Sequence, residues 1–195
     1  FFDTRRLRKP STDPVGDASH ADDPVTLQNL HLARDGKIPE ASYMIDETIA
    51  TAEVTDYRNW GGGTIVDVSP IGVIRDTLAL RRISFATGVH IIMGTGFYAK
   101  AFPDNMNIRT IEDLASDMIE DVTIGIDSSG IRAGIVGEVG IEGNPLTSNE
   151  VKVVQAAARA SRATGAALTF HRGGIDREKL LVLDLVMEEG ADLSR

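Results

Sequence analysis

The sequence lacks cysteine and has no long hydrophobic run, and each absence excludes a class of protein. Without cysteine the chain forms no disulfide, offers no thiolate to a metal ion and has no cysteine nucleophile. This composition fits a reducing compartment, and we expect a cytoplasmic location. The longest apolar runs are short, such as 91–93, so none is long enough to span a bilayer.

Positive charge is also scarce. The chain carries 20 Lys and Arg residues against 29 Asp and Glu residues, a net charge of −9, which argues against sequence-independent binding to nucleic-acid phosphates. The composition is nevertheless that of a folded protein, because 42% of the 195 residues are hydrophobic. A chain of this length and apolar content forms one domain with a buried core.

The two ends of the chain suggest an internal piece of a longer protein. The sequence begins with Phe1 and Phe2 rather than Met, and it stops within 190–195, where a new element is expected. Residues 1–40 contain four prolines and show no sustained hydrophobic period, which predicts an irregular N-terminal loop segment.

From residue 41 onward the hydrophobic pattern predicts alternating helices and strands. We expect helices over about 42–59, 76–86, 15 or so residues from Thr110, 147–165 and 176–189, and strands over 64–68, 89–93, 133–138 and 167–171. The strands are apolar on both faces, which is typical of a parallel sheet covered by helices. One helix followed by four strand–helix units fits either a doubly wound α/β sheet or part of a (β/α)8 barrel.

Two glycine motifs raise the question of a nucleotide site. Residues 94–99 formally satisfy G-x-G-x-x-A, but a loop sequence follows at 100–105, where a dinucleotide fingerprint requires a helix start. The three glycines at 61–63 precede their strand and are interpreted as a helix stop. Neither motif therefore favours a nucleotide-binding domain.

Glu138 and His171 are the strongest candidate site residues, because each ends a predicted strand. Adjacent parallel strands lie roughly 4.8 Å apart, so inward-pointing side chains at these ends could share one metal ion or two adjacent ones. A carboxylate and an imidazole without thiolate suit a catalytic zinc-type site. The alternatives are a salt bridge from Glu138 to a neighbouring arginine and a hydrogen-bonded structural role for His171.

Three further residues are weaker candidates. Asp67 ends its strand, where it either orients a ligand or caps a turn, and the second interpretation is favoured. His90 lies near the N-terminal end of its strand, away from the end at which barrel enzymes perform chemistry. Tyr98 follows a strand and either faces a substrate or packs within the protein.

Five segments in order carry a family resemblance. Together they resemble the phosphotriesterase family, which belongs to the amidohydrolase superfamily of metal-dependent (β/α)8 TIM barrels. The segments are 62–70, 93–98, 132–140, 145–150 and 169–171. The resemblance implies that residues 41–195 form part of such a barrel, about strands two to five, continuing beyond both ends in the full protein.

The resemblance also implies a site. The family binds two divalent metal ions, usually Zn²⁺, through an HxH pair on strand one, a bridging carboxylate on strand four, single histidines on strands five and six and an Asp on strand eight. Glu138 matches the bridging position of the glutamate-bridged branch, and His171 matches the strand-five ligand. The other ligands are absent from this chain, including the Asp that serves as proton shuttle, so no catalytic residue is assigned. Tyr98 is placed as a substrate-binding residue.

The function implied for the full protein is hydrolysis of ester-type bonds in a lactone, carboxylic ester or phosphotriester, with a hydroxide bridging two metal ions. We expect a small-molecule ester or lactone substrate and neither a nucleic acid nor a membrane as partner, and we leave a homodimer open. Two ligands do not replace the three that a catalytic zinc normally has, so the 195-residue piece by itself is expected to be inactive. The alternative is a non-catalytic barrel that binds a small ligand or a protein.

Overall fold

The centre of the protein is a four-stranded parallel sheet with the strand order β3-β4-β5-β6. The computed structural model describes residues 2–3, 23–35, 37–38, 43–73, 75–171 and 176–193. The strands are β3 (Thr64–Asp67), β4 (His90–Thr95), β5 (Ile135–Gly140) and β6 (Ala167–His171). The parallel sheet predicted from the apolar strands is therefore confirmed.

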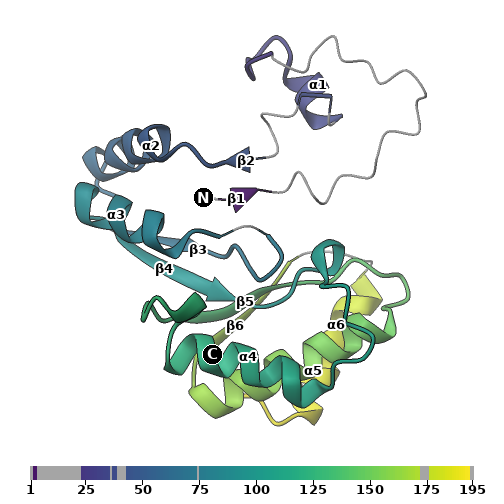
Figure 1. Ribbon diagram of the computed structural model, residues 1–195. Coiled ribbons are helices and arrows are strands. Elements are labelled where there is room, and N and C mark those ends of the chain that lie inside the picture. The colour runs from purple at the N-terminus through teal and green to yellow at the C-terminus, as the bar shows by residue number, and fades with distance from the viewer. Residues whose placement is uncertain are drawn as a thin grey trace.

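The helices follow the order that the hydrophobic pattern predicts. Helix α2 (Glu47–Asn59) precedes the sheet, and α3 (Thr77–Thr87), α4 (Ile111–Thr123), α5 (Ser148–Thr164) and α6 (Asp176–Glu188) each follow a strand. Helices α4, α5 and α6 lie together along one face of the sheet (Figure 1). None of the described helices combines the length and the apolar character that a bilayer crossing demands.

Short elements complete the described chain. Strands β1 (Phe2–Asp3) and β2 (Tyr43–Met44) pair antiparallel, and α1 (Leu30–Arg34) is a helix of little more than one turn. Two 3₁₀ turns, η4 (Ala99–Ala101) and η5 (Ile126–Ser128), interrupt the loops. Thus β1 and α1 lie within the segment 1–40 predicted to be irregular, most of which is outside the described residues.

Local sequence signals explain where the helices begin and end. Thr110 with Asp113, and Thr147 with Glu150, form the reciprocal hydrogen bonds of capping boxes at α4 and α5. Asp46 accepts hydrogen bonds from the N–H groups of Thr48 and Ile49, so α2 begins at Glu47 rather than near residue 42. Gly88 and Gly165 end α3 and α5 in the left-handed conformation, as such glycines commonly do.

The main hydrophobic core lies between the sheet and α4–α6. Small residues on α5 allow the helix to pack closely on its neighbours. On the opposite face of the sheet, the side chains of Val66 and Ile92 are exposed, at 46% and 38%. Because side chains alternate along a strand, Ile92 points away from Ile91 and Met93, which pack towards α3. The fully buried members of the main core include Phe97, Leu114, Met118, Val136, Val139, Val153, Val154, Ala156, Ala157 and Ala160.

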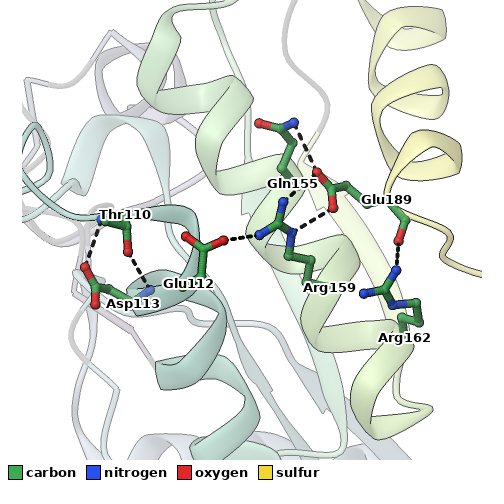
Figure 2. Close-up of polar contacts among 7 residues, drawn as sticks. All are labelled: Thr110, Glu112, Asp113, Gln155, Arg159, Arg162 and Glu189. Carbon is green, nitrogen blue, oxygen red and sulfur yellow. Dashed lines mark hydrogen bonds and ion pairs between the residues drawn. The ribbon is translucent and has the colours of Figure 1, made fainter.

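A polar network fastens the outer surfaces of three helices. Arg159 of α5 contacts Glu112 of α4, and its Nε donates to the Glu189 carboxylate directly after α6 at 2.7 Å (Figure 2). Gln155 donates to the same carboxylate at 3.1 Å, and Arg162 donates to the Glu189 carbonyl oxygen. These contacts hold α6 against α5 and thereby fix the helix that follows β6.

Candidate metal site

The side chains of Glu138 and His171 lie together at the carboxyl-terminal edge of the sheet. Nδ1 of His171 is 3.2 Å from Oε1 of Glu138, and the two side chains are 38% and 25% exposed, respectively. The proximity predicted from strand spacing is therefore found in the structure. Their role as metal ligands stays a prediction.

Glu138 is inside a β-bulge rather than at the end of its strand. Val136 pairs with Leu168 and Val139 with Phe170, so three residue steps along β5 match two along β6. The prediction that the strand covers 133–138 is wrong at both ends, because β5 runs from Ile135 to Gly140. It extends past Glu138 because Gly140 pairs with His171 and donates its N–H to the Phe97 carbonyl.

The bulge reaches across the sheet. The N–H of Glu138 donates to the carbonyl oxygen of Val68, which directly follows β3, at 3.2 Å. The bond therefore passes over β4, which lies between β3 and β5. Gly137 begins the bulge with a φ of 138°, a conformation that side-chain-bearing residues rarely adopt.

Tyr98 is the third member of the site. Its ring lies edge-on to the His171 ring with 5.0 Å between centroids. Burial, with smaller contributions from the negative charges of Glu142 and Glu138, raises the pKa of Tyr98 to about 12, so the phenol is protonated at neutral pH. Binding of a substrate by Tyr98 stays a prediction.

Gly140 is a site residue that sequence reasoning missed. A Cβ at Gly140 would lie 2.7 Å from Cδ2 of Tyr98 and 2.9 Å from the backbone nitrogen of Ala99. The absence of a side chain at Gly140 therefore leaves room for the Tyr98 ring in its position beside His171. The available signal was the glycine two residues after the candidate ligand Glu138.

Glu150 holds the loop that leaves the site. Its carboxylate accepts hydrogen bonds from the N–H groups of Glu142, Gly143 and Thr147 and from the Thr147 hydroxyl, at 2.6–2.8 Å. Burial opposes ionisation, but these hydrogen bonds outweigh it and lower the pKa of Glu150. The capping-box sequence indicated the contact with Thr147 but not the contacts with 142–143.

The remaining candidates lie elsewhere. Oδ1 of Asp67 accepts a hydrogen bond from the Ser69 N–H at 3.0 Å, which is the turn-capping role that the sequence favoured. His90 is the first residue of β4 and is exposed at the opposite end of the strand. No long helix begins at Gly94 and Gly96, since only the three-residue turn η4 follows, as expected for a sequence that is not a dinucleotide fingerprint.

The donor chemistry of the pair fits a divalent metal ion. A carboxylate and an imidazole are common zinc ligands, and both belong to side chains that remain partly exposed. Within the described part of the chain no third His, Cys, Asp or Glu joins them in a group that could hold a metal ion. The pair thus provides part of a coordination sphere.

Comparison with known proteins identifies the family. The sequence model of the phosphotriesterase family matches residues 12–195. This chain belongs to the phosphotriesterase family. A phosphotriesterase-related protein of Nematostella vectensis is 36% identical over 178 residues, which cover 88% of this chain and 50% of the relative. The human N-acetyltaurine hydrolase is 33% identical over 177 residues, which cover 89% of this chain and 50% of the relative.

Two solved structures share the fold of this chain. A resiniferatoxin-binding protein from Rhodobacter sphaeroides is 35% identical, with a TM-score of 0.87 over 98% of this chain and 54% of that one. The phosphotriesterase homology protein from Escherichia coli, solved with phosphate in its active site, is 28% identical, with a TM-score of 0.73 over 77% of this chain and 52% of that one. The predicted partial (β/α)8 barrel is therefore confirmed. The chain spans about half the length of each of these relatives.

Proposed function

We propose that the full protein is a metal-dependent hydrolase in which Glu138 and His171 hold divalent metal ions. The observation that carries the proposal is the 3.2 Å approach of these two side chains at the carboxyl-terminal edge of the parallel strands. Active sites of (β/α)8 barrels lie at this edge. Membership of the phosphotriesterase family supports the same assignment.

Each residue of the site has a defined task in this proposal. Glu138 would be shared by two ions, most suitably Zn²⁺, and His171 would bind one of them through a neutral ring nitrogen. When bound, the ions would supply an activated water and a positive charge that polarises the substrate oxygen. Tyr98 would direct its phenol to a polar atom of the substrate, since its ring already borders His171.

We propose an ester-type bond as the target, in a lactone, carboxylic ester or phosphotriester. An N-acyl amide is the second candidate, because several relatives, including the human one, are named N-acetyltaurine hydrolase. Water attacks a carbonyl carbon in esters, lactones and amides alike, so the same side chains serve each of these reactions. A panel containing a lactone, an aryl ester, a phosphotriester and N-acetyltaurine separates these substrate classes.

The test uses the protein encoded by the complete open reading frame. Glu138→Gln should lower bound zinc, measured by elemental analysis, and should reduce turnover of the preferred panel substrate by about 100-fold or more. Glu120→Gln changes an exposed carboxylate on α4 and serves as the matched control, with zinc content and turnover unchanged. Wild-type zinc content and rate in Glu138→Gln would refute the proposal.

A ligand-binding barrel without catalysis is the competing function. The resiniferatoxin-binding protein from Rhodobacter sphaeroides favours it, because that protein is named for binding. This alternative predicts no turnover of any panel substrate by the wild-type protein. Turnover that depends on Glu138 excludes it.

A further inference from the structure

Gly94 in β4 and Gly96 directly after it, the glycines of the G-x-G motif, lie against the bulge that carries Glu138. A Cβ at Gly94 would overlap the carbonyl oxygen of Gly137 and would lie 3.2 Å from Cα of Val68. A Cβ at Gly96 would lie 3.1 Å from the carbonyl oxygen of Glu138. Both peptide units around Glu138 therefore occupy the space that side chains at 94 and 96 would fill.

The hydrogen bonding explains why the backbone comes so close. Glu138 donates its N–H to the carbonyl oxygen of Val68, and this hydrogen bond holds the bulge against β4 at Gly94. Gly96 in turn accepts a hydrogen bond from the Ile71 N–H at 2.8 Å, which holds it in place from the side of β3. The position of the Glu138 backbone is thus fixed by its bond to Val68 and its contact with residues 94–96, while the flanking Val136 and Val139 pair with β6.

We propose that Gly94 and Gly96 are positioning residues for Glu138. Because they have no side chains, the bulge packs directly against residues 94–96, and this places the Glu138 carboxylate beside His171. The proposal gives a role to the G-x-G motif. The motif does not form a dinucleotide site, because the three-residue turn η4 follows it instead of a long helix. It rests on the proposed function, because the relative position of Glu138 and His171 matters if these two residues hold the metal ions. Metal sites tolerate displacements of only a few tenths of an ångström in their ligands.

Gly96→Ala is the sharper of the two possible substitutions. The nearest atom to its Cβ is one carbonyl oxygen at 3.1 Å, so a shift of a few tenths of an ångström relieves the contact and the fold is retained. Gly94→Ala would overlap a backbone oxygen outright and would disturb the sheet itself. The test therefore uses Gly96→Ala.

Two glycines provide matched controls. Nothing lies within 4 Å of a Cβ at Gly63, so Gly63→Ala adds a methyl group without a contact. A Cβ at Gly134 would lie 2.7 Å from Cγ2 of Ile92, so Gly134→Ala perturbs side-chain packing in the same sheet without touching the bulge. Together they separate a general effect of replacing glycine from a displacement of Glu138.

The experiment measures zinc affinity of the metal-stripped full protein by calorimetric titration with zinc ions. Gly96→Ala should keep the wild-type circular dichroism spectrum and bind zinc about 10- to 100-fold more weakly, as expected for residues that orient a ligand. Gly63→Ala and Gly134→Ala should bind zinc as the wild type does. Wild-type affinity in Gly96→Ala, loss of its fold, or an equal loss of affinity in Gly134→Ala overturns the proposal.

A crystal structure of metal-free Gly96→Ala tests the positioning role independently of metal binding. The separation of Glu138 Oε1 and His171 Nδ1 should exceed the wild-type 3.2 Å. An unchanged separation refutes the positioning role. Failure of the wild-type protein to bind zinc would instead count against the proposed function, and this distance would still decide the role of the glycines.

Discussion

Nη2 of Arg75 lies 2.9 Å from Oδ2 of Asp121, and both side chains are almost completely buried. Arg75 belongs to the loop between β3 and α3, whereas Asp121 lies on α4. The same carboxylate oxygen accepts a hydrogen bond from the hydroxyl of Thr95 at 2.6 Å, and Arg75 also donates to the Gly94 carbonyl. This ion pair therefore ties the loop after β3 and the end of β4 to a helix behind them.

Removal of the Arg75 cation should destabilise the protein strongly. Arg75→Met leaves the Asp121 carboxylate buried without its partner, at a cost of about 3–5 kcal/mol in the free energy of unfolding. Urea denaturation measures the effect. The double variant Arg75→Met/Asp121→Asn removes the stranded charge and should recover part of the loss.

The exposed pair between Arg82 and Glu47 provides the control. Its side chains are 56% and 37% exposed, so Arg82→Met should change the unfolding free energy little. Equal destabilisation by Arg75→Met and Arg82→Met would show that burial of the Arg75–Asp121 pair is unimportant.

The loop contacts of Glu150 should make stability depend on pH. The pKa of Glu150 is lower in the folded protein than its ordinary value of 4.5, so its contribution is complete above that value and is lost as pH falls through the folded pKa. Glu150→Ala leaves three N–H donors without their acceptor and should cost about 1–3 kcal/mol at pH 7. The difference in the free energy of unfolding between wild type and Glu150→Ala, measured by urea denaturation, should decrease as the pH is lowered. A difference that stays constant from pH 7 to pH 3 contradicts this, and Glu120→Gln is the control.

Helices and most strands were predictable because their signals are local. Thr110, Thr147 and Gly165 mark helix ends through contacts within a few residues, and the structure shows each of them in that role. The alternation of strands and helices follows from the same local pattern, but this pattern also fitted a doubly wound sheet, and the partial barrel was predicted from the family resemblance.

Contacts between distant residues were not predictable in this way. The Arg75–Asp121 pair joins residues 46 positions apart, and the bulge at Glu138 depends on a hydrogen bond to Val68. Sequence periodicity describes one element at a time, so it placed Glu138 at a strand end instead of inside a bulge. The proximity to His171 was nevertheless predicted, because adjacent parallel strands end at the same edge of a sheet.

Loss of Arg159 should be detectable at Glu189. The hydrogen bond and charge of Arg159 lower the pKa of Glu189, so Arg159→Gln should raise that pKa towards the ordinary value of 4.5 (Figure 2). Amide hydrogen exchange in α6 should also accelerate, because one of the side chains that join α6 to α5 is gone. Carboxyl titration by NMR measures the first effect, with Arg82→Gln as control. An unchanged pKa of Glu189 would mean that the ion pair is absent in solution.

Tyr98 offers a test of the substrate side of the site. Tyr98→Phe keeps the ring against His171 and removes only the hydroxyl, so zinc content should be unchanged while kcat/KM falls about 2- to 10-fold. Tyr98→Ala also removes the ring that borders His171 and should reduce zinc affinity as well.

Tyr57 supplies the matched control for the hydroxyl. It donates to the Thr64 carbonyl at 2.8 Å, at the opposite end of the strands, so Tyr57→Phe should leave kcat/KM and zinc content unchanged. A kcat/KM of Tyr98→Phe equal to that of the wild type would show that the phenol does not contact the substrate. An equal loss in both variants would point instead to a general effect on folding, because Tyr98 lies beside the candidate metal ligands whereas Tyr57 contacts Thr64 at the other end of the strands.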